Sequence, residues 1–371
     1  MKQSNIIDHI QPFNDLFYRV CFYNSLFPLL NSNEGSCLSF LVNDVSVYHG
    51  EIVNDLPKLE VQYRSNFSLE QLLELHGIDH YKKQISNDIE CDVMEDIDRG
   101  RPVIVWVDCF YEKIRNDTYM KKHLSHTWLI HGYNKDERMV HIIEHKYSDS
   151  LTYEKRVVGF SDLNNCYDGY IIHNKQTCGF PRFYECQSEC GFYHSQDYHT
   201  RCGFPKYHNF ANKSEIASYI SFDLQNKHNR YFTQERCKDI YLTQIALNLE
   251  FIWDGLAVLR QYLGWLKEIF MNEEKLRIHC EEIVTDLNNI VNSKHADKYK
   301  NEHLFGKESA LYAKANDLAR AYSTVRSVVT KFMYSQIYDR QKMESLFSYL
   351  DDLPGMENDY YSETRLQLGF V

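Results

Sequence analysis

The 371-residue chain contains little proline and glycine, with 7 and 15 residues respectively. Disordered and low-complexity chains are often rich in one or both residue types, so this composition argues against those classes. No window approaches the run of about 18 apolar residues that a membrane-spanning helix needs. The N-terminal sequence MKQSNIIDHIQPFND also lacks the apolar core of a signal peptide. We therefore expect neither a membrane span nor an export signal.

Positive charge is also scarce, because 41 lysines and arginines face 52 acidic residues and leave a net charge of −11. An acidic chain is a poor candidate for general nucleic-acid binding, but it tolerates a cationic partner such as a polyamine or an aminosugar. The 11 cysteines are an odd number without an export signal. They predict free thiols in a reducing cytoplasm.

Aromatic and apolar residues are abundant, with 28 tyrosines, 21 phenylalanines and a hydrophobic content of 43%. The length and this composition allow two domains with sizeable cores. We expect a mixed α+β domain over residues 1–176, a linker or insertion rich in cysteine and aromatic residues over 177–229, and a helical domain over 230–371. Apolar residues spaced by three and four from Leu242 to Phe270 and from Leu311 to Phe332 indicate an antiparallel helical bundle.

The clearest pattern lies between residues 103 and 145. The runs 103–107, 127–133 and 138–144 are predicted strands, and the polar segment 134–137 is a turn between the last two. A hairpin folded about Lys135 places His126 opposite Glu144, which is the arrangement of a catalytic base and the acid that orients it. A register slip of one residue would separate the two side chains. The alternative interpretation is a histidine and a glutamate at a strand end without a catalytic role.

A cysteine precedes this pattern. The segment 17–31 (FYRVCFYNSLFPLLN) predicts a helix with one buried face, and Cys21 lies near its start. A thiol at a helix N-terminus has a lowered pKa, as a nucleophile requires. The alternative is a core cysteine, since free cysteines are among the most buried residues. Cysteine, then histidine, then acid is the order found in papain-like enzymes, where the residues meet in space.

Three other side chains near this pattern are candidates for supporting or rival roles. Asp108 ends the strand 103–107 and is a rival to Glu144 as the orienting acid, or a supporting residue behind it. His123 would replace His126 only if its strand began earlier. His145 follows Glu144 directly, so its side chain is expected on the other face of the strand.

Several further elements are expected from local patterns. Residues 68–76 predict a helix with a capping box formed by Ser68 and Gln71. Strand-like pieces are expected at 38–42 and 45–48, another strand at 169–173, and a last short helix at 343–350.

The segment 178–208 repeats Cys-Gly-Phe three times at a period of 12 residues. Its cysteines and histidines make a structural zinc site conceivable, although none of the cysteine pairs has the C-x2-C spacing typical of one. A sequence duplication in an aromatic loop is the preferred interpretation. We therefore assign no metal site.

The runs VCFYNSLFPLL, VIVWVDCFY, HTWLIHGYN and VHIIEH together resemble the butirosin biosynthesis protein H N-terminal family, over roughly residues 10 to 175. The resemblance implies an α+β fold with a papain-like, cysteine-peptidase-type N-terminal domain, commonly followed by an α-helical bundle domain. It also implies transfer of an acyl group from a carrier-protein thioester to an amine acceptor, in pathways linked to nonribosomal peptide synthesis.

By position, the resemblance makes Cys21 the nucleophile, His126 the base and Glu144 the orienting acid. Such patterns more often carry aspartate at the third position, and papain-like enzymes place a glutamine a few residues before the cysteine for the oxyanion hole. Here the candidates for that donor are Gln11, Asn14 and Asn24, together with the Cys21 backbone N–H. The expected partners are an acyl or peptidyl carrier protein, which delivers phosphopantetheine, and a small amine; the enzyme itself needs no cofactor.

Three other functions stay open from the sequence. A thioesterase or peptidase would use the same triad but pass the acyl group to water. A non-catalytic papain-like scaffold would bind a synthetase partner and leave Cys21 unreactive. A structural zinc protein would be built on residues 178–208.

Overall fold

A computed structural model describes residues 2–32, 36–53, 56–145, 152–176, 217–224 and 231–367. The chain forms two compact units. The sheet unit comprises the described residues within 1–37 and 67–231, and the helical unit comprises those within 38–66 and 232–371. The expected N-terminal domain therefore differs from the sheet unit, because 38–66 belongs with the C-terminal helices. The Cys-Gly-Phe repeat at 178–208 lies outside the described residues.

The sheet unit is built on a seven-stranded sheet with the order β4-β9-β5-β6-β7-β8, and β1 pairs with β6. All of its pairings are antiparallel. Its strands are β1 (Ser4–Ile6), β4 (Asp79–Lys83), β5 (Val103–Asp108), β6 (Ser125–Asn134), β7 (Met139–His145), β8 (Tyr153–Gly159) and β9 (Tyr219–Asp223). Its helices are α1 (Cys21–Ser32), α3 (Leu69–Leu75), α4 (Ile89–Asp98), the 3-10 turn η1 (Cys109–Tyr111) and α5 (Phe160–Gln176).

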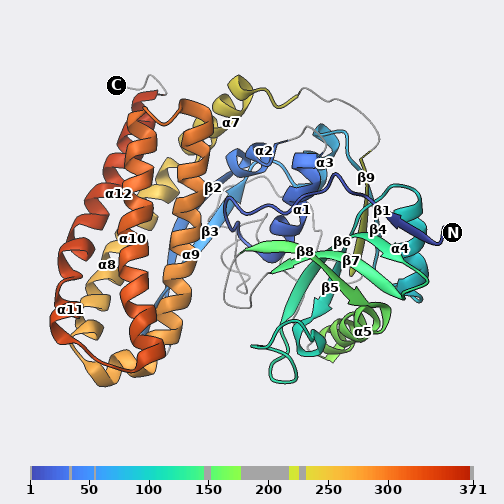
Figure 1. Cartoon of the computed structure of the whole chain (residues 1–371). Coiled ribbons are helices and arrows are strands. Elements are labelled where there is room, and N and C mark those ends of the chain that lie inside the picture. Colours follow the sequence, from blue (N-terminus) through green and yellow to red (C-terminus); the bar gives the residue numbers. More distant parts are fainter. Residues whose placement is uncertain are drawn as a thin grey trace. The chain divides into compact units, whose positions relative to one another are not determined.

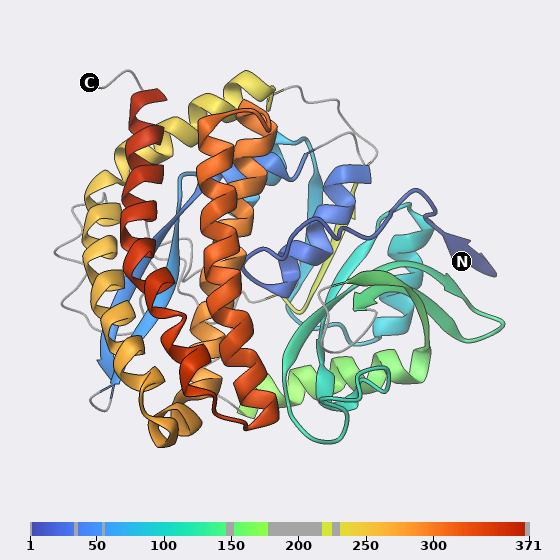
Figure 2. The same ribbon diagram turned by 60° about the vertical axis from the view of Figure 1, so that its left-hand side comes forward.

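The centre of this sheet consists of the strands that the sequence predicts. Every residue of β5 is buried, as its unbroken apolar run predicts. In Figures 1 and 2 the sheet lies between α1 and α5. The stacking of Phe22 on Trp106, with ring centroids 5.5 Å apart, joins α1 to β5. This contact holds the start of α1 against β5, which pairs with β6, the strand that carries the candidate histidine.

The register of the β6–β7 hairpin differs from the predicted one. Near the turn, Asn134 pairs with Met139, but beyond an irregularity after Ile130 the pairing becomes Leu129 with Ile143. Extending this pairing by one residue places Trp128, rather than His126, opposite Glu144. The difference is two residues, so His126 and Glu144 still share a face of the hairpin. Without the irregularity the shift would be three residues, and the two side chains would lie on opposite faces.

Local patterns elsewhere give both confirmed and wrong predictions. The capping box of Ser68 and Gln71 is present at the start of α3. Residues 38–42, predicted as a strand, lie in the helix α2 (Leu38–Asn43), and residues 169–173 lie within α5 instead of a separate strand. The helix expected at 343–350 is replaced by α11 (Arg340–Glu344) and a long α12 (Phe347–Gln367). Packing overrides local preference at these places.

The helical unit combines a two-stranded hairpin with long helices. Its other elements are β2 (Asp44–Val53), β3 (Leu56–Ser65), α7 (Gln234–Leu247), α8 (Leu249–Phe270), α9 (Glu273–Phe305) and α10 (Ala310–Ser335). Figure 2 shows the blue hairpin running beside these helices. A Cβ atom added to Gly255 of α8 would lie 2.7 Å from the Tyr48 carbonyl oxygen of β2. Only glycine permits this approach, which explains why 38–66 packs with the C-terminal helices.

The apolar positions spaced by three and four in this part of the sequence are buried, which confirms the helical C-terminal region. Among the described residues, no single helix is long and apolar enough to cross a membrane; α7 and α8, bent by 65° at their junction, reach that length and apolarity only when taken together.

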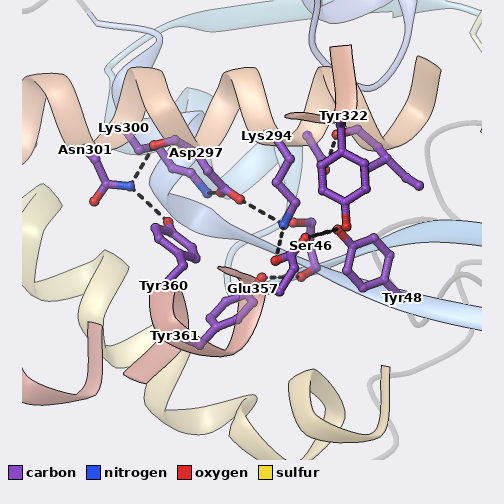
Figure 3. Close-up of polar contacts among 12 residues, drawn as sticks. Ser46, Tyr48, Lys294, Asp297, Lys300, Asn301, Tyr322, Glu357, Tyr360 and Tyr361 are labelled. Carbon is purple, nitrogen blue, oxygen red and sulfur yellow. Dashed lines mark hydrogen bonds and ion pairs between the residues drawn. The ribbon is translucent and has the colours of Figure 1, made fainter. Parts of the chain in front are cut away.

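A buried polar cluster lies inside the helical unit (Figure 3). The Lys294 ammonium donates to a Glu357 carboxylate oxygen at 2.8 Å and lies 3.7 Å from an Asp297 oxygen. The other Asp297 oxygen lies 2.8 Å from the Lys300 ammonium. The hydroxyls of Tyr48 and Tyr322 donate to the other Glu357 oxygen. All of these charged residues are buried. The cluster therefore links β2, α9, α10 and α12 through two cations and two anions.

Candidate active site

The nucleophile candidate is the first residue of α1. The chain enters the helix through a fixed loop, because the buried Asn24 side chain accepts from the Tyr18 N–H at 3.1 Å and donates to the Leu16 carbonyl at 3.0 Å. Cys21 is half-buried and free of disulfide bonding. The N–H groups of a first helical turn have no intrahelical partners, so the backbone around Cys21 presents donors as well as a thiol.

His126 joins the cysteine to the acid. Its Nε2 atom lies 2.9 and 3.0 Å from the two Glu144 carboxylate oxygens. The His126 side chain also hydrogen bonds to the Cys21 thiol, as does the Thr127 side chain. Because Nε2 faces Glu144, Nδ1 is the nitrogen that faces sulfur. The three residues therefore form one chain of hydrogen bonds, from thiol to imidazole to carboxylate.

The charged forms of Cys21, His126 and Glu144 stabilise one another. Burial alone would raise the pKa of the Cys21 thiol, but the charge and hydrogen bond of His126 outweigh it and lower that pKa. Burial would lower the pKa of His126, yet the charges of Glu144 and Cys21 raise it well above its ordinary value. Burial would raise the pKa of Glu144, but His126 keeps that pKa low. The site favours a thiolate, an imidazolium and a carboxylate together.

The three side chains expected to serve the oxyanion hole have other partners. Gln11 is exposed and donates to the Asp8 carbonyl. Asn14 donates to the Tyr153 carbonyl at 3.0 Å and accepts from the Tyr153 N–H at 2.6 Å. The oxygen and the nitrogen of the Asn24 side chain are both hydrogen bonded to the loop before α1. Of the donors expected from the sequence, this leaves the Cys21 backbone N–H.

Asp108 pairs with His123, not with His126. Its Oδ2 atom lies 2.6 Å from His123 Nδ1, and its Oδ1 atom accepts from the backbone N–H groups of Phe110 and Leu124. The His123 ring stacks on Phe110, with ring centroids 4.3 Å apart. The rival arrangement, with Asp108 as the orienting acid of His126, is therefore absent from the described residues.

We expect Asp108→Asn to lower the unfolding free energy by about 1–3 kcal/mol, because a buried acceptor of three hydrogen bonds loses its charge and one acceptor position. Urea unfolding measures this loss. The rate of Cys21 alkylation should stay within twofold of the parent rate. If Asp108→Asn slowed the alkylation of Cys21 as much as Glu144→Gln does, Asp108 would be a residue that activates Cys21.

A second carboxyl, missed by the sequence reasoning, lies beside the triad. Glu112 is buried, accepts from the Trp128 indole N–H at 3.1 Å through Oε1, and has no hydrogen-bond partner at Oε2. Burial and the nearby charge of Glu144 raise the pKa of Glu112 to about 7. Two neighbouring buried carboxyls resist simultaneous ionisation, so below about pH 7 Glu112 holds a proton while Glu144 is charged.

This arrangement predicts a pH-dependent stability. The folded state binds a proton at Glu112 more tightly than the unfolded chain does, so its contribution is complete below about pH 4.5 and is lost as the pH rises to about 7. The shift corresponds to about 3 kcal/mol. We expect Glu112→Gln to unfold at higher urea concentration than the parent at pH 8, and at a similar concentration at pH 4.5. The exposed Glu95→Gln is the control, and equal behaviour of both variants would refute the prediction.

His145 and Tyr153 also lie at the site, contrary to the expectation for His145. The His145 ring stacks on His126, with centroids 5.3 Å apart, and its Nε2 atom lies 4.0 Å from Glu144. Tyr153, paired with His145 across the β7–β8 ladder, packs its ring 4.3 Å from the His145 ring. Within a strand, successive side chains point to opposite faces. His145 is the last residue of β7, so this alternation does not determine the direction of its side chain.

Among the residues that the structure describes, the group of Cys21, His126 and Glu144 is the arrangement on which we base a function. Its parts come from α1, β6 and β7, and the described geometry joins Cys21, His126 and Glu144. Comparison with known proteins adds no assignment: no family model matches this chain, and no curated protein matches it significantly.

Proposed function

We propose that this protein is a cysteine-dependent acyltransferase, with a papain-like sheet unit, that moves an aminoacyl or peptidyl group from a carrier-protein thioester to an amine. The observation that carries the proposal is the hydrogen-bonded chain of Cys21, His126 and Glu144. The sequence resemblance to the butirosin biosynthesis protein H N-terminal family supports the choice of thioester and amine.

The proposed reaction has two halves. The Cys21 thiolate attacks the thioester carbonyl, and the tetrahedral oxyanion is stabilised by the Cys21 backbone N–H. The pantetheine thiolate leaves with the proton of His126 Nδ1. The exchange of one thioester for another is nearly isoenergetic, so little driving force is needed.

In the second half, an amine attacks the acyl group on Cys21. His126 Nδ1, now neutral, accepts the proton of the amine, and Glu144 stabilises the imidazolium that forms. The amide leaves and the thiolate–imidazolium pair returns. The net negative charge of the chain, −11, is compatible with a cationic acceptor such as a polyamine or an aminosugar.

Intact-protein mass spectrometry tests this proposal. The protein is incubated with a panel of acyl-pantetheine thioesters, with and without polyamine and aminosugar acceptors, beside Cys21→Ala. We expect a mass gain that requires Cys21 and that is discharged by an amine. Discharge to water alone would assign a thioesterase or peptidase instead. No adduct with any thioester, together with slow alkylation of Cys21, would assign a non-catalytic scaffold.

A further inference from the structure

Nitrogen and oxygen atoms of three side chains near Cys21 lie close enough together to bind one ion. His126, Glu144 and His145 are all buried, and each offers a ligand atom within 4.8 Å of those of the other two. The two Glu144 carboxylate oxygens face the two rings, with Oε2 2.9 Å from His126 Nε2 and Oε1 4.0 Å from His145 Nε2. The catalytic proposal uses only His126 and Glu144, so it leaves the position of His145 unexplained.

Two imidazoles and a carboxylate are a donor set typical of zinc sites. Ligands bound tetrahedrally at about 2.0–2.1 Å from zinc are roughly 3.3 Å apart. The two separations to Glu144 lie on either side of that value. Small side-chain movements would therefore bring all three donors to one ion.

A neighbouring residue gives an independent indication of a polar ligand. The Tyr153 hydroxyl is buried and has no hydrogen-bond partner, while its ring packs on His145. Buried hydroxyls are almost always hydrogen bonded. An unpartnered hydroxyl on the ring that packs against His145 points to a further polar group near this residue, which a metal-bound water would provide.

We propose that His126, Glu144 and His145 form a binding site for a divalent transition-metal ion of the zinc class, and that the bound ion inhibits catalysis at Cys21. Binding replaces the Nε2–H of His126 with a metal–nitrogen bond and releases that proton to solvent. The remaining proton is then fixed on Nδ1, facing sulfur. His126 can then neither give a proton to a leaving thiolate nor accept one from an attacking amine, so an acyl-enzyme formed from an ester whose leaving group departs as an anion accumulates.

This geometry separates the proposed site from ordinary zinc binding at a cysteine–histidine pair. Cys21 faces Nδ1 of His126, whereas the carboxylate and the metal face Nε2. One ion cannot use both nitrogens of the same ring. The proposed site therefore does not need the thiol, and Cys21→Ala keeps all three of its ligands.

The test compares the full-length parent, Cys21→Ala and His145→Phe, using zinc and a chromophoric chelator as competitor. Phenylalanine retains a ring between His126 and Tyr153 but supplies no ligand. Because thiols elsewhere in the chain also bind zinc, the quantity measured is the difference in bound zinc between variants, after long incubation to let the ion reach buried donors. We expect Cys21→Ala to bind as much zinc as the parent, and His145→Phe to bind one equivalent less, with an affinity loss at that site of at least about 100-fold.

A second readout uses 4-nitrophenyl acetate, which acylates reactive cysteines without a carrier protein. Zinc should slow the steady-state turnover of the parent but leave the size of the initial burst unchanged, and a chelator should reverse this effect. His145→Phe should turn over at a similar rate with and without zinc. Loss of zinc binding in Cys21→Ala, or equal binding in the parent and His145→Phe, would overturn the proposal. The binding readout does not depend on acyl transfer, so it can succeed or fail separately from the proposed function.

Discussion

His126→Ala is expected to slow acylation of Cys21 by about 10,000-fold at pH 7. Burial is the strongest influence on the pKa of the Cys21 thiol and raises it, and His126 supplies the charge and hydrogen bond that overcome burial. Without the imidazole, sulfur remains a protonated thiol at neutral pH. The leaving thiolate also loses its proton donor, so both roles of His126 disappear together.

The measurement is the single-turnover rate of acyl-enzyme formation with an acyl-pantetheine thioester, followed by intact mass. His141→Ala is the matched control, because His141 lies on the same hairpin but outside the triad. It should keep the parent rate. A loss smaller than about tenfold in His126→Ala would show that Cys21 does not depend on this base.

The second large effect concerns stability of the helical unit, where Lys294→Met should lower the unfolding free energy by about 3–5 kcal/mol. Lys294 and Glu357 are at most 1% exposed and lie 2.8 Å apart (Figure 3). Burial would lower the pKa of Lys294, but the charges of Glu357 and Asp297 raise it, so the ammonium stays charged. Removing it takes away the ion-pair partner of the buried Glu357 carboxylate, while Asp297 keeps its contact with Lys300.

A double variant separates the lost charge from lost packing. Glu357→Gln added to Lys294→Met removes the uncompensated anion while keeping an acceptor for the Tyr48 and Tyr322 hydroxyls. We expect the double variant to recover most of the lost stability. Urea unfolding followed by the fluorescence of Trp253 and Trp265, which belong to this unit, measures all three proteins. A double variant no more stable than Lys294→Met would show that the ion pair itself is not the source of the effect.

The residues of the triad could be found from sequence because each leaves a local signal. Cys21 stands at the start of an apolar helical pattern, and His126 and Glu144 flank a recognisable turn. The register could not be predicted, because the irregularity after Ile130 has no evident residue signature. The hairpin of β2 and β3 was assigned to the wrong unit, since its packing against α8 depends on contacts about 200 residues distant.

The last helix extends well beyond its predicted end, because α12 runs to Gln367 whereas the sequence predicted an end at Leu350. α1 and α12 both continue past internal prolines, Pro28 and Pro354. In each helix the buried face extends beyond the proline, so packing outweighs the lost backbone hydrogen bond. The roles of Glu112 and His145 were also missed. Both depend on which buried side chains surround a residue, which a single sequence does not reveal.

The proposed chemistry depends on Cys21 being held as a thiolate by His126 and Glu144. Its most direct test is the pH dependence of Cys21 alkylation by iodoacetamide, followed at the peptide that contains Cys21, in the parent and in Glu144→Gln. Because the pKa of Cys21 is lowered, we expect a midpoint for the parent below the ordinary thiol value of about 8.5. Glu144→Gln should have a higher midpoint, because His126 loses the charge that keeps it protonated. A parent midpoint at or above about 8.5, unchanged in the variant, would contradict this expectation and make Cys21 an ordinary core thiol.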